Sequence, residues 1–464
     1  MTHCRSFIVI LIVSLLAVSC DSAQTGSSLV PGSEKLILII GDGMDDQQIT
    51  IGRNYLAGRQ GRLSLDAMPF RGVVRVYGVS ENDPDQVNYV TDSAGTATAM
   101  ATGFVTSSAR VGTMAKTDEH RTNILELAQS AGIGTGIVTT ASVTDATPAS
   151  FVAHINNRWC QGPESMAGTF MRAPQLAYEC SSSIKSNGGL GSIAEQIAYS
   201  SVDIVLGGGR EHFEELIDGD SNADVLQLAE SKGFMITDDL SSVATYPTGS
   251  KVLGLFSMDT MPVMLRGVDD AKAQRLTKSG DALQMPEPFS CEPNPEFSGM
   301  PTLPEMTSAA LKHLDNQDSF ILVIESASID KQSHARRPCG HIGELGQLDA
   351  TLKMALEYAE LHPETMILVT ADHGHVAHII SETSMFAAQG FGSPGYFARV
   401  RTPEGGIMGV NYASTDMPII EGHSGAQVPL YAYGPGVESI PSFIDQTGIF
   451  GLAAGHLGLV VPDR

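Results

Sequence analysis

Six short apolar runs, each of strand length, are the feature that most limits the fold of this chain. They begin the segments KLILIIGDG, GTGIVTTAS, VDIVLGGG, SFILVIESAS, TMILVTADHGH and VPLYAYGPG, and in each segment glycine, serine, threonine or an acidic residue closes the apolar run. Apolar residues fill these runs almost continuously, as expected of strands in a parallel sheet that is buried on both faces. Helical stretches such as TNILELAQSAG and LGQLDATLKMALEYAELH lie between them. The alternation predicts an α/β fold with a large, mostly parallel sheet.

Acidic residues lie where three of the predicted strands end. Asp42, Glu325 and Asp372 each follow or close an apolar run. In open parallel sheets, ligands bind beyond the carboxyl ends of the strands, so we expect the functional site at this edge. Two segments look like insertions on the core: residues 243–305, rich in prolines and turn signals, and residues 379–420, rich in glycine with little helical period.

The net charge of the chain limits the classes of molecule that it can bind. The 52 Asp and Glu against 28 Lys and Arg give a net charge of -24, which argues against binding to nucleic acids or anionic membranes. An anionic substrate would need a local concentration of positive charge. Bound metal ions supply such charge in acidic proteins.

The N-terminus has the pattern of an export signal. Residues 1–20 contain a short polar start, the apolar run FIVILIVSLLAV and then small residues. The run is too short for a convincing membrane span. The stretch LAVSC also resembles a bacterial lipoprotein cleavage box, which would make Cys20 the lipidated first residue of the mature chain; ordinary cleavage nearby is the alternative. We therefore expect a periplasmic or secreted protein, or a membrane-anchored lipoprotein.

Four cysteines remain once Cys4 and Cys20 are set aside. An even number in an exported chain predicts two disulfides, and pairing of nearest neighbours joins Cys160 to Cys180 and Cys291 to Cys339. Buried free thiols are the alternative.

Two motifs have the spacing of metal ligands. In SIDKQSHA, Asp330 and His334 are four residues apart, so on a helix both face one side and could bind one ion, although an exposed ion pair has the same spacing. In TADHGH, the side chains of Asp372, His373 and His375 follow a predicted strand, and carboxylate with imidazole suits zinc. His423, in the glycine-flanked turn EGHSGA, says little by itself. Asp42 lies between two glycines after a predicted strand, which suits either a tight turn or the approach of the backbone to a ligand.

The stretch YVTDSAGTATAMATG offers a serine that has no histidine near it in the sequence. The simplest interpretation of Thr91, Asp92 and Ser93 is an N-cap cluster ahead of a helix. Ser93 as a nucleophile would need another source of activation.

Together the segments IIGDGM, YVTDSAGTATAMATG, VTDATPASFVAHINNRWCQGP, SIDKQSHA, VTADHGH and EGHSGAQVPLYAYGP resemble bacterial alkaline phosphatases, in the order of that family. The resemblance implies one catalytic domain over residues 35–464. It also implies a three-layer sandwich with helices on both sides of the sheet and a small crown-like insertion, roughly residues 379–420, near the active site. The implied reaction is hydrolysis of phosphate monoesters through a phosphoserine on Ser93, for phosphate scavenging, by a homodimer. A phosphodiesterase of the same superfamily is the alternative.

The resemblance also implies roles for individual residues, with two zinc ions and one magnesium ion per chain. One zinc would be held by Asp330, His334 and His423, and the second by Asp42, Asp372 and His373 with Ser93. Magnesium would be held by Asp42, Thr147 and Glu325, because hard oxygen ligands suit it. Arg158 in HINNRWC takes the position of the arginine that binds the phosphoryl group. Asp145, Lys331 and His375 match positions behind the ligands, and the aspartate and lysine are typical of members that prefer magnesium.

Overall fold

The structure is a computed structural model of the chain. It describes residues 33–170, 173–219, 222–279, 282–381, 395–412 and 422–461, and the predicted signal peptide lies outside them. No helix within these ranges is both long enough and apolar enough to cross a membrane.

A ten-stranded sheet forms the centre of the fold, in the order β24-β2-β23-β17-β1-β16-β5-β8-β10-β9. The seven strands from β17 to β9 run parallel to one another. They are β17 (Thr365–Thr370), β1 (Lys35–Gly41), β16 (Phe320–Ser326), β5 (Gly134–Ser142), β8 (Ile204–Gly208), β10 (Lys251–Leu255) and β9 (Phe234–Thr237). Every residue of β1, β16, β5, β17 and β8 is buried, which explains their continuous apolar runs. The α/β fold and the mostly parallel sheet are confirmed.

The remaining strands extend the sheet beyond β17. The run VPLYAYGPG forms β23 (Val428–Tyr433), which pairs antiparallel with β17 and with β2 (Phe70–Arg75), while β24 (Phe443–Asp445) pairs parallel with β2. A buried apolar run does not encode the direction of its strand, so the sequence could not show this reversal.

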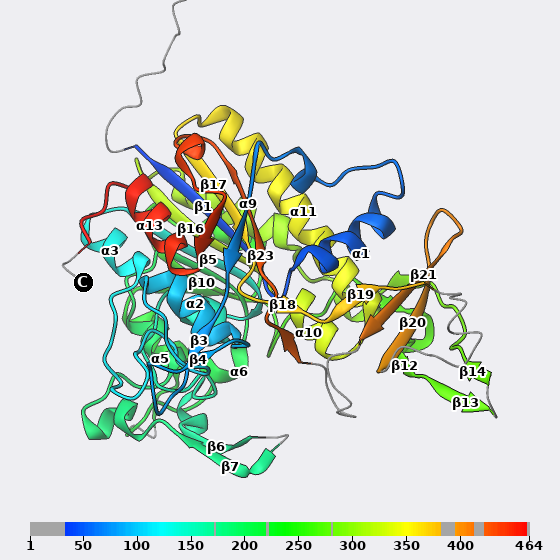
Figure 1. Cartoon of the computed structure of the whole chain (residues 1–464). Coiled ribbons are helices and arrows are strands. Elements are labelled where there is room, and N and C mark those ends of the chain that lie inside the picture. Colours follow the sequence, from blue (N-terminus) through cyan, green and yellow to red (C-terminus); the bar gives the residue numbers. More distant parts are fainter. Residues whose placement is uncertain are drawn as a thin grey trace, which may run out of the picture. The chain divides into compact units, whose positions relative to one another are not determined.

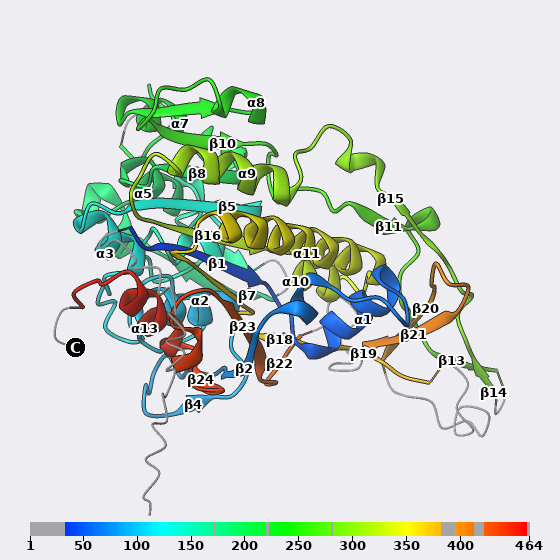
Figure 2. The same cartoon turned by 90° about the horizontal axis from the view of Figure 1, so that it is seen from above.

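Helices cover the sheet on both faces (Figures 1 and 2). On one side α9 (Leu303–Leu314) and the long α11 (Pro338–Leu361) pack on the strands, and α1 (Asp46–Leu56) packs on α11. On the other side lie α2 (Ser93–Thr102), α3 (Ile124–Ser130), α4 (Ala146–Ala149) and α13 (Thr447–His456). The other α-helices of the described residues are α5 (Ile193–Tyr199), α6 (Arg210–Phe213), α7 (Val225–Ser231), α8 (Leu240–Val243) and α10 (Ser328–His334).

The prediction that residues 243–305 form an insertion is wrong for the first part of this segment. The stretch KVLGL forms β10, a strand of the central sheet, and the prolines that surround it in the sequence hid this short run. The rest of the segment forms short strands, among them β11 (Leu265–Gly267), β12 (Gln274–Arg275) and β15 (Cys291–Pro293).

The described parts of residues 379–420 contribute to a separate antiparallel sheet, in the order β12-β20-β21-β19. Its other strands are β20 (Tyr396–Arg401), β21 (Ile407–Tyr412) and β19 (Ala377–Ile379). It has a small apolar core of its own, in which Tyr412 and Val400 are fully buried together with Ile51 and Ile342 of α1 and α11. The rest of the expected insertion, 382–394 and 413–420, lies outside the described residues.

Both disulfides form between nearest neighbours. Cys160 pairs with Cys180 and Cys291 pairs with Cys339, across sequence separations of 20 and 48 residues. In the chain-entropy model, a disulfide that closes a loop of this size stabilises the folded protein by about 3–4 kcal/mol. The first disulfide fixes the chain two residues after Arg158, and the second ties β15 to the start of α11. Structural disulfides are typical of proteins outside the cytoplasm.

Candidate active site

Three neighbouring parallel strands bring the predicted acidic residues to one edge of the sheet. β1 lies between β16 and β17, with Ile40 opposite both Glu325 and Thr370. Asp42 and Asp372 lie two residues after Ile40 and Thr370. The glycine between Asp42 and Met44 has a φ of 69° and donates its N–H to Asp372 Oδ1 over 3.0 Å. A Cβ at Gly43 would lie 3.1 Å from Cβ of Asp330, so the turn needs glycine for both its conformation and its close approach.

One cluster gathers around the ring of His373. Its Nε2 lies 3.4 Å from Asp42 Oδ1, 3.3 Å from Asp372 Oδ2 and 3.1 Å from the Ser93 hydroxyl. All four residues are buried. No described residue hydrogen-bonds to Asp42 Oδ1 or Asp372 Oδ2, which is costly for buried carboxylate oxygens unless a cation occupies the site. We call this group the serine-side cluster.

A second cluster surrounds Asp330 on α10. Asp330 Oδ2 lies 3.3 Å from His334 Nε2, and its Oδ1 lies 3.4 Å from His375 Nε2 and 3.5 Å from His423 Nε2. The two-residue strands β18 (Gly374–His375) and β22 (His423–Ser424) pair with His375 opposite His423, which brings the distant EGHSGA segment to the site. Asp330 is buried among imidazoles, so the exposed ion pair that its spacing allowed is excluded. We call this group the imidazole-rich cluster.

The third expected group consists of oxygen ligands. The Thr139 hydroxyl donates to Glu325 Oε2 over 2.5 Å, and Glu325 lies close enough to Asp42 to raise its pKa. Burial and the Asp145 charge raise the pKa of Glu325 to about 8, against the opposing effect of Thr139, Lys331 and Thr147. The Thr147 hydroxyl is buried and has no hydrogen-bond partner among the described residues, but it is near enough to Glu325 to lower the pKa of that carboxyl.

The pKa directions differ between the carboxyls of the site: the neighbouring imidazoles hold the pKa of Asp330 below its usual value in spite of burial, whereas the pKa values of Asp42 and Asp372 are raised. Burial, Asp372, Asp330 and Glu325 raise the pKa of Asp42 well above its usual value. Burial, followed by the Asp330 charge, raises the pKa of Asp372 to about 6. Burial and neighbouring imidazoles lower the pKa of His373 and His375. Carboxyls with a raised pKa and imidazoles with a lowered pKa are both suited to binding a metal ion. A divalent cation stabilises the ionised carboxylate, and it binds the neutral form of imidazole.

The residues present therefore fit metal ions. Two sets offer ligand atoms that lie within 4.8 Å of one another. They are Asp42, Asp372 and His373, and Asp330, His334, His375 and His423. Carboxylate and imidazole together suit zinc, whereas the oxygens of Asp42, Glu325 and Thr147 suit magnesium. His375, expected behind the ligands, lies in contact with the Asp330 carboxylate.

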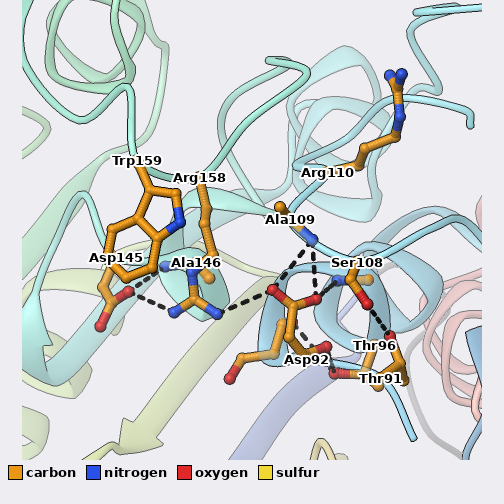
Figure 3. Close-up of polar contacts among 12 residues, drawn as sticks. Thr91, Asp92, Thr96, Ser108, Ala109, Arg110, Asp145, Ala146, Arg158 and Trp159 are labelled. Carbon is orange, nitrogen blue, oxygen red and sulfur yellow. Dashed lines mark hydrogen bonds and ion pairs between the residues drawn. The ribbon is translucent and has the colours of Figure 1, made fainter. Parts of the chain in front are cut away.

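Arg158 is clamped between two carboxylates beside these clusters (Figure 3). Its NH1 lies 3.2 Å from Asp92 Oδ2 and its NH2 2.8 Å from Asp145 Oδ1, while Lys331 bonds the other oxygen of Asp145. Burial opposes ionisation of Asp145, but the Lys331 and Arg158 cations outweigh it and hold its pKa below the usual value. Asp145 and Asp92 likewise hold the pKa of Arg158 above its usual value in spite of burial.

Sequence reasoning missed the contact between Asp92 and Arg158. Asp92 is the N-cap of α2, as expected, and accepts from Gly95 N over 3.1 Å. It also accepts from Ala109 N and pairs with Arg158. An aspartate before a helix looks like a cap in any sequence, so no local signal reveals this second partner.

A buried serine among acid and imidazole clusters, at the carboxyl edge of a parallel sheet, fits a metal-dependent phosphohydrolase. The alkaline phosphatase family model matches residues 33–404, and the chain belongs to this family. It is 37% identical over 459 residues to streptomycin-6-phosphate phosphatase of Streptomyces griseus, covering 97% of this chain and 96% of that protein. It is 36% identical over 435 residues to alkaline phosphatase of Escherichia coli (strain K12), with 92% and 86% covered.

Solved structures agree in fold. The alkaline phosphatase from the Antarctic bacterium TAB5 superposes with a TM-score of 0.65 at 23% identity, covering 93% of this chain and 99% of that one. The protein is therefore a phosphatase of the alkaline phosphatase family, with two groups of residues that could hold metal ions.

Proposed function

We propose that this protein hydrolyses phosphate monoesters to an alcohol and inorganic phosphate through a covalent phosphoserine on Ser93. The observation that carries the proposal is the position of the Ser93 hydroxyl, buried and 3.1 Å from His373 Nε2 inside the serine-side cluster. Ser93 is also the first residue of α2, all of whose residues are buried. The N-terminus of a helix favours an anion beside it, which suits a phosphoryl group bound to this serine.

The metal sites are proposed as two zinc ions and one magnesium ion. Asp330, His334 and His423 would hold one zinc and Asp42, Asp372 and His373 the other, while Asp42, Thr147 and Glu325 would hold magnesium. When bound, these ions lower the pKa of oxygen nucleophiles and stabilise negative charge that develops on the phosphoryl group and the leaving oxygen. A variant of the TAB5 enzyme has been solved with Mg bound in its M3 site, which supports a magnesium site of this kind.

Arg158 binds and orients the phosphoryl group. Its guanidinium can donate two parallel hydrogen bonds to non-bridging oxygens, and it can keep them as the phosphorus becomes five-coordinate. Asp92 and Asp145 hold the guanidinium through ion pairs on two sides. Because the side chain is already ordered, binding of substrate costs less conformational entropy. The side chain is only 15% exposed, so water competes weakly for these donors.

The reaction consists of two in-line displacements. The Ser93 hydroxyl loses its proton to solvent and its Oγ forms a bond to phosphorus, while the ester oxygen leaves and takes up a proton to give the alcohol. Water then loses a proton and forms a bond to phosphorus, while Ser93 Oγ leaves and regains its proton. Each displacement inverts the configuration at phosphorus. The proposal therefore requires net retention of configuration.

Replacement of the nucleophile tests the proposal. Ser93→Ala should lower turnover of p-nitrophenyl phosphate by more than about a thousandfold, because no other hydroxyl takes its place. Ser130→Ala, an exposed serine of α3, is the control and should keep its activity. Acid quenching during turnover, followed by mass spectrometry of the peptides, should find phosphate on Ser93. Full activity of Ser93→Ala would disprove the phosphoserine route, and faster cleavage of bis-(p-nitrophenyl) phosphate than of the monoester would favour a phosphodiesterase.

The biological setting is also a proposal. We propose that residues 1–20 export the protein to the periplasm or the medium, where it scavenges phosphate from monoesters as a homodimer. Lipidation of Cys20 would anchor it to a membrane. One relative is named for a single antibiotic phosphate, so a panel of monoesters tests the breadth of specificity. Mass spectrometry of the mature N-terminus tests the cleavage site and the lipid, and light scattering tests the dimer.

A further inference from the structure

A cavity lined in part by Lys331 adjoins the candidate active site. It has a volume of about 540 Å3, within the range of about 300–1,000 Å3 typical of small-molecule sites. Its lining includes Thr260 and Met261, which follow β10, and Met261 N donates to the carbonyl of Thr140 in β5 over 2.9 Å. The cavity thus lies at the carboxyl edge of the sheet, where the catalytic clusters lie, and it is bordered by β11, which packs beside α11 (Figure 2).

Lys331 connects the cavity with the catalytic groups, because it contacts both. Lys331 lines the cavity, and its ammonium bonds Asp145, which in turn holds Arg158. On α10, Ser328, Lys331 and Gln332 line the cavity, whereas Asp330 and His334 belong to the imidazole-rich cluster. One short helix therefore borders both the metal ligands and this cavity.

The lining combines positive and negative side chains. Its charged and amide groups include Arg266, Asp270, Glu296, Lys331, Gln332 and Arg337. The guanidinium of Arg266 lies 2.9 Å from Glu292 and that of Arg337 lies 3.0 Å from Asp270. Each of these arginine side chains is about one third exposed, at 36% and 37%, so each is oriented by a carboxylate and still accessible to a ligand. Asp270 also has a φ of 59°, a strained conformation of the kind that gathers at ligand sites.

We propose that this cavity is the leaving-group subsite of the phosphatase, and that it favours phosphate monoesters of polyhydroxylated alcohols of the sugar type. A hydroxyl both donates and accepts hydrogen bonds, whereas a guanidinium only donates and a carboxylate only accepts. A lining that mixes the two therefore satisfies several hydroxyls at once. An apolar leaving group would instead remove the charged groups from water without replacing their partners. The inference rests on the proposed function, because it assigns the leaving group of that reaction.

Two substrates that differ only in their hydroxyls test the subsite. Glucose 6-phosphate and cyclohexylmethyl phosphate both release a primary alcohol attached to a six-membered ring. The wild-type protein should have the higher kcat/KM for glucose 6-phosphate. Arg266→Leu and Arg337→Leu should each lower the ratio of the two kcat/KM values by about tenfold to a hundredfold, the usual effect of one hydrogen bond to a charged group. Arg75→Leu is the matched control, since Arg75 also pairs with one carboxylate, Asp445, but lies outside this cavity. It should leave the ratio unchanged.

Binding to a protein without the nucleophile separates this inference from the proposed function. Titration calorimetry of Ser93→Ala should show tighter binding of glucose 6-phosphate than of cyclohexylmethyl phosphate, and Arg266→Leu in the same background should remove most of the difference. Equal affinities, or a preference that survives both arginine replacements, would overturn the subsite. A wild-type protein that binds glucose 6-phosphate in this way but hydrolyses no monoester would instead overturn the proposed function.

Discussion

The serine-side cluster and the Arg158 network lie side by side but handle charge in opposite ways. In the network, Asp145 bonds both Arg158 and Lys331, and Asp92 pairs with Arg158 from the other side. In the serine-side cluster, the carboxylates of Asp42 and Asp372 repel each other, and one oxygen of each has no described hydrogen-bond partner. The network is complete without added ions, whereas the cluster requires positive charge from outside the chain. From this contrast we expect Asp145 and Asp92 to stabilise the fold and Asp42 and Asp372 to bind metal ions.

The largest expected effect comes from removing an acid of the serine-side cluster. Asp42→Asn should lower phosphatase activity by more than about a thousandfold, because the carboxylate is the proposed ligand shared by zinc and magnesium. In chelator, however, the same variant should be more stable than the wild type, by about 1–3 kcal/mol, since a buried and repelled carboxyl is replaced by a neutral amide of the same shape. Urea unfolding of both proteins in EDTA measures this difference. A large loss of stability in EDTA would mean that Asp42 is a structural acid.

The next largest effect is a loss of stability in the metal-free protein, opposite in sign to the gain expected for Asp42→Asn. Asp145→Ala leaves the Arg158 and Lys331 cations without their common partner, and these side chains are only 15% and 30% exposed. We expect the metal-free protein to lose about 2–4 kcal/mol of unfolding free energy. A second replacement, Lys331→Met, should restore part of this loss when added to Asp145→Ala, and the double-mutant cycle gives the coupling energy. If Asp145→Ala stabilised the metal-free protein as Asp42→Asn does, the contrast between the two regions would not hold.

A smaller, pH-dependent effect is expected at an ion pair away from both regions. The buried His154 has its Nε2 2.8 Å from Glu126 Oε1 and its Nδ1 2.9 Å from the carbonyl of Gly112, and it stacks on His120. Burial lowers the pKa of His154, but Glu126 and the Gly112 carbonyl raise it to a net value above its usual 6.5. Burial raises the pKa of Glu126, but its hydrogen bond and ion pair with His154 lower it to a net value below the usual one. A histidine with a raised pKa stabilises the fold fully below pH 6.5 and loses this effect as the pH rises through its folded pKa.

Replacement of His154 measures this contribution. The stability lost in His154→Gln should be greatest near pH 6 and should decline toward pH 9, by roughly 1 kcal/mol or less because Glu126 is partly exposed. Urea unfolding across this range, beside the wild type, gives the difference at each pH. A loss that is constant with pH would mean that His154 is neutral and acts only through its hydrogen bonds.

Much of the fold could be predicted from the sequence because buried parallel strands have a strong local signature. The runs around Asp42, Glu325 and Asp372 showed both the strands and the edge at which the acids gather. The reversed direction of β23 could not be predicted, because direction depends on the path of the chain through distant segments. β10 was obscured by prolines on both sides of a five-residue run.

The site shows the same division between local and distant information. Asp330 and His334 could be paired from their spacing on α10, but Asp330 is buried against His375 and His423, which come from two other segments. The clamp of Asp92 on Arg158 joins residues 66 positions apart and has no local signature. The family resemblance supplied the ligand sets that spacing left open, and the structure adds the distances at which they lie.

The central claim is that the unsatisfied clusters bind metal ions for catalysis, and elemental analysis of the purified, active protein tests it most directly. We expect two zinc ions and one magnesium ion per chain in the wild type, with zinc and magnesium both reduced in Asp42→Asn. A fully active protein that contains neither metal would contradict the account.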